Sequence, residues 1–278
     1  MSLLAGLLKD IFGQGAASVG VSHAGFAESA SAFTTAEPPA WTLLDADLHL
    51  HSLHPDSVSL SLLLMIPDTP GCVLDVGCFC GGNGRWLKAR FPACHITGVE
   101  MLEKAAAVAM NDYDRVIVGR LEDVDFASEG LLLGRFDAII AGDVLEHMVN
   151  PWQALQRLKP LLSPAGALYA SIPNVRNLRV VQALAKGLWP YDRFGIKDVT
   201  HLRFFTKAEI EKMFAETGWV IDAIDYKFDA GLMALVEGRD LESINTFEMD
   251  GLTLTGMSKN DVMEYLTVQF LVRASPAK

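Results

Sequence analysis

Between residues 72 and 173, short apolar runs alternate with longer stretches in which apolar residues return every three or four positions. The runs predict buried strands and the stretches predict helices. Buried strands that alternate with helices are typical of a parallel sheet covered on both faces, and right-handed crossovers favour a doubly wound order. The expected strands are 72–76, 95–100, 115–119, 136–142 and 166–173, and the expected helices are 85–91, 102–110 and 151–162.

The regular alternation ends near residue 174. Two more helices are expected at 178–188 and 207–217, the second with Thr206 as its N-cap, and two more strands at 219–228 and 267–275. Residues 229–265 lack a clear period and are interpreted as an inserted cap or loop region.

The first 40 residues have a different character. One helical face gathers apolar side chains, and a stretch rich in Ala, Ser, Gly and Thr follows it at 13–38. We therefore expect an N-terminal helix and linker over 1–40 and the main domain over 41–278. The helical face suits packing on the domain or on a second copy, which makes a homodimer possible. Its members are Leu4, Leu7, Leu8, Ile11 and Phe12.

The net charge of the chain and the length of its apolar runs indicate which partners to expect. Lys9 and Asp10 interrupt the N-terminal apolar stretch, and no run of about 18 apolar residues occurs, so we expect a cytoplasmic protein without stable membrane insertion. The net charge of -11 repels phosphate backbones, which excludes nucleic acid as an expected partner. The cysteines form no CxxC pair and are expected to be reduced and buried.

Histidines near residue 50 raise the question of a metal. The segment DLHLHS, residues 47–52, resembles the opening metal motif of histidinol-phosphatase-like phosphoesterases. That fold needs several further His and Asp ligands, which this chain does not supply in a matching pattern. We therefore expect no metal site, and we interpret the segment as covering the sheet or lining an acceptor pocket.

The most informative segment is VLDVGCFCGGNGRW, residues 73–86, a strand that runs into a Gly-rich turn and a helix start. A dinucleotide fingerprint needs a middle glycine for close approach to a pyrophosphate, and Phe79 stands there. This bulky ring argues against NAD or FAD. Glu100, directly after the second strand, is suited to accept hydrogen bonds from ribose hydroxyls.

Several motifs occur together in one order: LDVGCFCGGNG, GVE, GRLEDVDF and AGDVLEHM, followed by SIPNVRN and DVTHLRFFTKAEIEKMFAETGW. Over roughly residues 70–228 the chain resembles the class I S-adenosylmethionine-dependent methyltransferases, and the later motifs resemble a subgroup linked to glycan modification. The resemblance implies an enzyme with a Rossmann-like, mostly parallel sheet, helices on both faces and an antiparallel last strand. It implies S-adenosylmethionine as the cofactor.

The resemblance also implies positions for the cofactor. The methionine end would lie against the Gly-rich turn, the ribose and adenine against the ends of the second and third strands, and the fourth strand would line the remainder. Arg120 departs from the family, which often has Asp there. The implied cofactor-binding residues are Asp75, Gly77, Cys78, Phe79, Gly81, Glu100, Met101, Leu121, Gly142 and Asp143.

Methyl transfer to a hydroxyl needs a base, and histidine suits this task. We expect His201 as the base, oriented by Asp198, with His147 as the alternative. The expected acceptor is a sugar, a glycan or another small hydroxylated metabolite. Alternatives are a non-catalytic S-adenosylmethionine-binding protein, an N-methyltransferase and a nicotinamide-dependent oxidoreductase. The expected acceptor contacts are Asn174, Arg176, Tyr191 and Arg193.

Overall fold

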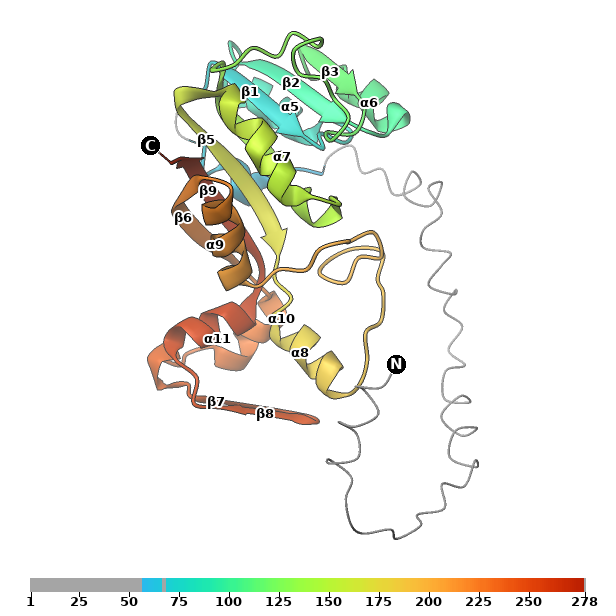
Figure 1. Ribbon diagram of the computed structural model, residues 1–278. Coiled ribbons are helices and arrows are strands. Elements are labelled where there is room, and N and C mark those ends of the chain that lie inside the picture. The colour runs from blue at the N-terminus through green and yellow to red at the C-terminus, as the bar shows by residue number, and fades with distance from the viewer. Residues whose placement is uncertain (1–56, 67–68, 278) are drawn as a thin grey trace, which may run out of the picture. The chain divides into compact units, whose positions relative to one another are not determined.

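The protein is described here by a computed structural model that covers residues 57–66 and 69–277. Seven strands form one sheet in the order β3-β2-β1-β4-β5-β9-β6 (Figure 1). Strand β9 runs antiparallel to both of its neighbours, and the other neighbouring pairs are parallel, so the predicted fold class is confirmed. The strands are β1 Cys72–Val76, β2 His95–Glu100, β3 Arg115–Val118, β4 Phe136–Gly142, β5 Leu162–Pro173, β6 Trp219–Phe228 and β9 Thr267–Pro276.

Successive residues of the central strands face two different apolar cores. Leu74 and Ile139 pack on the side of α7 (Pro151–Leu158) and α9 (Lys207–Glu216), which lie on the same face of the sheet in Figure 1. Val73 and Ile140 pack on the other side, with α4 (Leu60–Leu63), α5 (Gly82–Arg90) and α6 (Glu103–Ala109). Burial on both faces explains why these strands are mostly apolar in the sequence, with one aspartate in each of β1 and β4.

Two predicted boundaries move. Helix α5 begins at Gly82 and not at residue 85, because Gly81 ends the turn in the left-handed conformation and the helix follows at once. Strand β5 begins at Leu162, four residues before the apolar run that predicted it, because Phe136 pairs with Leu162 ahead of an irregularity in the ladder. The other expected strands and helices are found within a few residues of their predicted places.

Residues 230–266 form a small folded unit with α8 (Leu178–Ala185), next to the end of β5 (Figure 1). The segment expected as a cap or loop therefore has a core of its own. A capping box at Ser258 and Asp261 starts its last helix. Its elements are α10 Ala230–Met233, η5 Ala234–Val236, η6 Leu241–Ser243, β7 Thr246–Met249, β8 Leu252–Thr255 and α11 Lys259–Leu266. The core residues are Leu178, Leu232, Val236, Ile244, Phe247, Val262 and Leu266.

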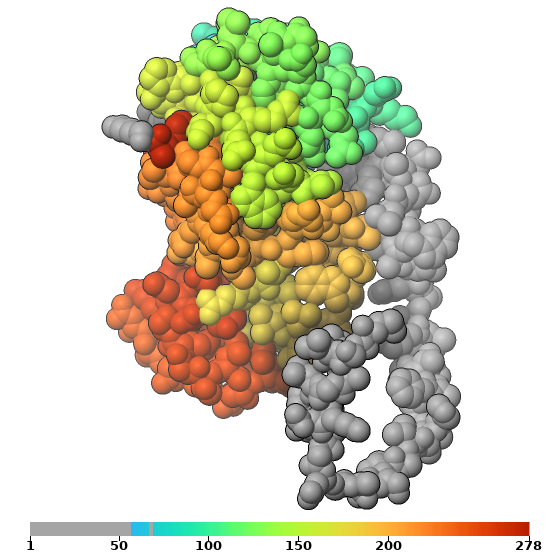
Figure 2. Space-filling view, viewed as in Figure 1, coloured from blue at the N-terminus to red at the C-terminus, as the bar shows by residue number. Residues whose placement is uncertain are grey.

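A long connection, loop 186–206, joins α8 to α9, and its surface lies directly below α7 in the space-filling view (Figure 2). The expected N-terminal helix, the linker and the DLHLHS segment lie outside the described residues. Within the described ranges, none of the helices is long and apolar enough to cross a membrane.

Candidate functional site

The carboxyl ends of β1, β2 and β4 meet at one edge of the sheet. Val76 is paired with Val99 on one side and with Ala141 on the other, so the three following loops start side by side. The Gly77 N–H donates to the Val99 carbonyl at 2.8 Å. A Cβ at Gly77 would lie 2.8 Å from a methyl carbon of Val144, so this close approach requires glycine.

The turn after β1 uses left-handed backbone at three alternate positions. Gly77, Phe79 and Gly81 have φ of 69°, 45° and 88°. Glycine adopts this region freely, whereas a left-handed Phe costs about 1–2 kcal/mol. The Phe79 N–H donates to a carboxylate oxygen of Glu100 at 2.8 Å, a charge-assisted bond that offsets this strain. The residue that departs from the dinucleotide pattern therefore still forms the turn.

Glu100 is the residue predicted to hold a ribose. It is 5% exposed at the end of β2, and its second oxygen accepts from the Leu102 N–H at 2.8 Å. Each oxygen then keeps one lone pair, which fits the two hydroxyls of a ribose. Met101, the neighbour expected to flank the adenine, is 60% exposed beside it.

Asp75 lies beneath the turn and is 1% exposed. Its Oδ2 accepts from the Tyr113 hydroxyl at 2.5 Å, whereas its Oδ1 has no hydrogen-bond partner among the described residues. Burial raises the pKa of this carboxyl from 3.8 to about 7. An unpartnered acceptor under the turn fits the ammonium of a methionine moiety. Cys78 is buried beside it, and the pKa of its thiol is raised by desolvation.

The loop after β3 is held by α7, whose apolar side chains share one core with Leu121. Leu121 is 5% exposed, and its carbonyl accepts from the Arg157 guanidinium at 2.9 Å. Arg120 points to solvent and pairs with Glu122 at 3.3 Å. Position 120 therefore carries a cation paired with a neighbouring glutamate, where the family often has a carboxylate.

The loop after β4 begins with Gly142 and Asp143. A Cβ at Gly142 would lie 3.1 Å from the Ser59 hydroxyl. Asp143 is left-handed with φ of 55°, its N–H donates to the Ser171 hydroxyl at 2.9 Å, and its carboxylate accepts from Gln269. Burial raises the pKa of this carboxyl. Asp143 thus connects the predicted cofactor edge with the cavity described next.

A cavity of about 700 Å³ opens beside Asp143. Polar side chains from the segment after β4, the start of α8, loop 186–206, the end of β6 and its following residue, and β9 line it. The polar lining residues are Asp143, His147, Asn177, Arg179, Asp192, Lys197, Asp198, His201, Lys227, Asp229 and Gln269.

The structure brings His147 and His201 together. Their ring centroids lie 4.6 Å apart at 76°. His201 Nδ1 lies 3.2 Å from the Ile196 carbonyl. Because a carbonyl only accepts, Nδ1 carries the proton and Nε2 keeps a free lone pair. Desolvation lowers the pKa of both imidazoles, so both rings are neutral near pH 7.

Asp198 acts on the other histidine. Its carboxylate accepts from the Thr200 hydroxyl at 2.6 Å, and the oxygen of that hydroxyl lies 3.0 Å from His147 Nδ1. Because the Thr200 proton points to Asp198, this oxygen accepts from Nδ1–H of His147. The Asp198 carboxylate is thus linked to His147 through the Thr200 hydroxyl, while its charge also raises the pKa of His201, and the orienting role predicted for Asp198 toward His201 stays a prediction.

A third titratable group belongs to this cluster. One ligand atom each of Glu146, His147 and His201 lies within 4.8 Å of the other two, a grouping that suits a metal ion. Glu146 is 1% exposed, and neither of its oxygens has a hydrogen-bond partner in the described part of the chain. These residues come from two distant segments, so no spacing in the sequence indicates their grouping, and the expectation of no metal site stays a prediction.

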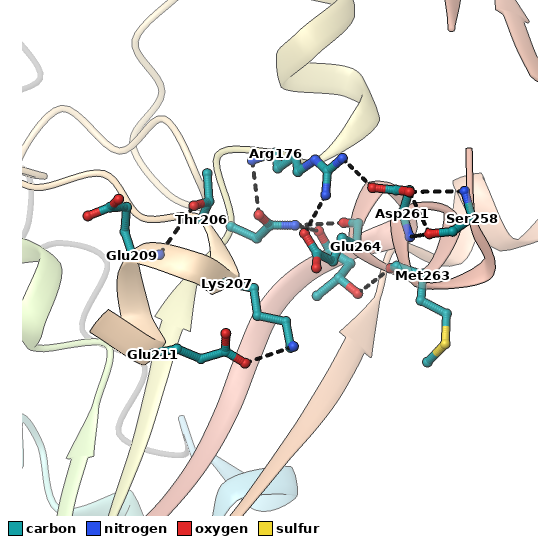
Figure 3. A network of polar contacts seen from close by, with 11 residues as sticks. Arg176, Thr206, Lys207, Glu209, Glu211, Ser258, Asp261, Met263 and Glu264 are labelled. Carbon is teal, nitrogen blue, oxygen red and sulfur yellow. Dashed lines mark hydrogen bonds and ion pairs between the residues drawn. The ribbon is translucent and has the colours of Figure 1, made fainter. Parts of the chain in front are cut away.

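Asn174 and Arg176 have structural partners in place of the predicted acceptor contacts. Asn174 is 0% exposed, and its amide donates to the Glu264 and Thr267 carbonyls at 2.7 and 3.0 Å. Figure 3 shows Arg176 reaching α11, where it pairs with Asp261 at 2.6 Å and Glu264 at 2.7 Å. Both residues thus connect the end of β5 with the 230–266 unit.

Tyr191 and Arg193 are exposed and are not among the residues that line the cavity, although the intervening Asp192 is. The cavity instead takes Arg179, Lys197 and Lys227, which the sequence pattern did not single out. These three residues lie far apart in the sequence, on a helix, a loop and a strand, so no motif predicts that they line one cavity. Only the fold shows it.

A family model described as a methyltransferase domain matches residues 56–224, which is more than half of the chain. The chain belongs to the class I S-adenosylmethionine-dependent methyltransferases. It is an enzyme, and its cofactor is S-adenosylmethionine.

Curated relatives of this methyltransferase include the ubiquinone biosynthesis O-methyltransferase of Dechloromonas aromatica, 29% identical over 154 residues, which are 50% of this chain and 64% of that protein. The chain thus spans less than two thirds of that relative. The malonyl-[acyl-carrier protein] O-methyltransferase of Geobacter sulfurreducens is 23% identical, over 74% of this chain and 77% of that protein. A methyltransferase solved in complex with the Haloferax volcanii Trm112 activator shares the fold, with a TM-score of 0.55 and 16% identity over 86% of this chain and 95% of that chain.

Proposed function

We propose that this methyltransferase transfers the methyl group of S-adenosylmethionine to a hydroxyl of a neutral, hydroxyl-rich acceptor, such as a sugar unit of a glycan. The observation that carries the proposal is the cavity of about 700 Å³ beside Asp143, whose wall combines apolar surface with many hydrogen-bonding side chains, two neutral histidines among them. A cavity lined by many hydrogen-bonding groups suits a ligand with many hydroxyls. The two curated relatives are both named as O-methyltransferases, which supports oxygen as the accepting atom.

The charges of the cavity favour a neutral acceptor. Arg179 pairs with Asp229 at 2.8 Å, and Lys197 pairs with Asp192 at 3.2 Å. Lys227 donates to the Gln269 side chain at 2.8 Å. With two of the three cations neutralised by carboxylates, the lining offers no concentrated positive site for a phosphate or a carboxylate ligand.

The cofactor residues act by position. Asp75 would hold the ammonium of the methionine end, Glu100 the ribose hydroxyls, and the backbone at Leu121 the adenine edge, while Gly77, Cys78, Phe79 and Gly81 form the turn against which the cofactor lies. Met101, Gly142 and Asp143 would complete the lining. When bound, S-adenosylmethionine supplies an electrophilic methyl group on a sulfonium.

The histidines receive the proton that the acceptor hydroxyl loses. We assign this role to Nε2 of His147. Its Nδ1–H donates to the Thr200 hydroxyl, which donates to Asp198, and this chain would stabilise the imidazolium that forms. His201, the base favoured by the sequence, lies against it with its own Nε2 free. In this assignment His201 orients the acceptor hydroxyl.

Calorimetric titration with S-adenosylhomocysteine tests the cofactor site. We expect saturable binding that Glu100→Ala abolishes and that Glu103→Ala, an exposed glutamate at the start of α6, leaves unchanged. Equal loss in both variants, or saturable binding of NAD in a parallel titration, would contradict the assignment.

Transfer of a labelled methyl group to a panel of acceptors tests the substrate class. Neutral saccharides are expected to be methylated, and His147→Gln to lower the rate by roughly 10²–10⁴-fold, the usual contribution of a general base. Methylation of amines alone, with a rate that His147→Gln leaves intact, would overturn the proposal in favour of an N-methyltransferase.

A further inference from the structure

Glu146 carries a buried carboxyl group that the proposed methyl transfer does not use. It lies in η3 (Leu145–His147), is 1% exposed, and has no hydrogen-bond partner for either oxygen among the described residues. An ionised carboxylate in such a place costs several kcal/mol unless a cation or a proton neutralises it. Within the described part of the chain, the titratable groups that act on it include the imidazoles of His147 and His201 and the carboxylates of Asp143 and Asp198, and these carboxylates make an unneutralised charge on Glu146 less favourable still.

We propose that Glu146, His147 and His201 form a binding site for one divalent transition-metal ion of the zinc type. Two imidazoles and one carboxylate are the ligands that such ions prefer. The ligand atoms already lie within 4.8 Å of one another. In a tetrahedral site with bonds of about 2.1 Å, they would be about 3.4 Å apart, a change that small side-chain rotations supply.

The hydrogen bonds behind the histidines match this role. A metal-bound imidazole donates the N–H of its other nitrogen to a carbonyl, or to a group that is itself hydrogen-bonded to a carboxylate. This hydrogen bond fixes the orientation of the ring and its tautomer. His201 Nδ1 is held by the Ile196 carbonyl at 3.2 Å. His147 Nδ1 is held by Thr200 at 3.0 Å, and Thr200 in turn donates to Asp198 at 2.6 Å. Both Nε2 atoms are thereby left for the ion.

The backbone holds the two segments of the site at a fixed spacing. The N–H groups of Leu202 and Arg203 donate to the Glu146 carbonyl at 2.8 and 3.0 Å, which ties loop 186–206 to η3. His147 and His201 also line the large cavity, so the positions of the ion not taken by protein would face the acceptor. An acceptor hydroxyl bound there would have its pKa lowered by the ion. In the metal-loaded protein the proton of this more acidic hydroxyl would pass to water in the cavity, whereas in the metal-free protein Nε2 of His147 would take it.

The test is a calorimetric titration of full-length, untagged protein, stripped with a chelator and dialysed, with ZnCl₂. One equivalent is expected to bind, and MgCl₂ is expected to bind far more weakly because imidazole ligands disfavour it. Glu146→Gln preserves the shape of the side chain and should weaken zinc binding at least ~100-fold. Zinc should also raise the Tm of the parent protein but not that of Glu146→Gln.

The matched control is the triple variant His49→Gln/His51→Gln/His54→Gln, which removes the other closely spaced histidines of the chain and should bind zinc as the parent does. Loss of zinc binding in this control, or undiminished binding in Glu146→Gln, would overturn the proposed site. If Glu146 is neutralised only by a proton, no zinc equivalent will bind. These readouts do not depend on methyl transfer, so failure of the metal site and failure of the proposed function are separable.

Discussion

Asp75 beneath the Gly-rich turn makes the stability of the protein depend on pH. Its pKa is 3.8 in the unfolded chain and about 7 in the folded one, because burial disfavours the charged form. The folded protein therefore binds this proton more tightly. The stability contributed by the protonated group is fully present below the unfolded pKa and is lost as the pH rises through the folded one. Between pH 5 and pH 8 these two pKa values lower the free energy of unfolding by about 2.5 kcal/mol.

Asp75→Asn removes this titration and keeps an oxygen that can accept from Tyr113. Its new amide N–H₂ takes the place of an oxygen that has no partner, which costs about 1–3 kcal/mol at every pH. We therefore expect the variant to be less stable than the parent at pH 5. The deficit should shrink by about 2.5 kcal/mol by pH 8, because the parent alone loses the contribution of its buried carboxyl.

Urea unfolding at pH 5, 6, 7 and 8, followed by tryptophan fluorescence and circular dichroism, measures this difference. Subtracting variant from parent removes the titration of all other groups. The control is Asp123→Asn, whose side chain is 76% exposed, and its difference from the parent should not change with pH. A difference for Asp75→Asn that stays constant from pH 5 to pH 8 would refute the assignment of a raised pKa to this carboxyl.

Three further predictions concern stability. The free energy of unfolding of Phe79→Gly should exceed that of Phe79→Val by at least ~1 kcal/mol, because a β-branched residue tolerates φ of 45° worst. Urea unfolding measures both values, and equal values would contradict backbone strain at this position. Arg176→Ala should reduce hydrogen-exchange protection in α11 while sparing the central strands, because two ion pairs are lost; Lys207→Ala, which breaks only a helix-surface pair, is its control. Gly84→Ala should lower the free energy of unfolding by about 1–3 kcal/mol, because its Cβ would lie 2.1 Å from the Tyr113 ring, and an unchanged Tm would refute this.

The sheet could be predicted from the sequence because its strands are buried on both faces. Runs such as 72–76 and 136–142 are apolar except for one aspartate each, and a glycine, Gly77 or Gly142, marks the point where each run ends. The 230–266 unit gave no such signal. Its helices and strands are short, and its core forms only when Leu178 from a distant helix packs against Phe247 and Leu266. Periodicity within a segment cannot report a core that is shared between segments.

The predicted site divides along the same line. The position of Glu100 follows from the end of one strand and from the turn that precedes it, so local spacing was enough. Asn174 also follows a strand, yet its amide is bonded to carbonyls near the start of β9, a pairing that depends on chain returning from residue 264 onward. A polar residue at a strand end is equally well placed for a ligand or for a structural bond, and only the partner decides which.

The cluster around Glu146 shows what tertiary structure adds to chemistry. Its backbone carbonyl is held by two N–H groups of loop 186–206, so η3 cannot shift to expose the side chain without releasing that loop. The charge of the carboxylate consequently has to be neutralised where it lies, by a proton or by a cation, and desolvation raises its pKa accordingly. Protonation of Glu146 would neutralise the carboxylate but would give the two neighbouring neutral imidazoles no role. A metal ion would use all three groups at once and would account for the hydrogen bonds that fix both rings.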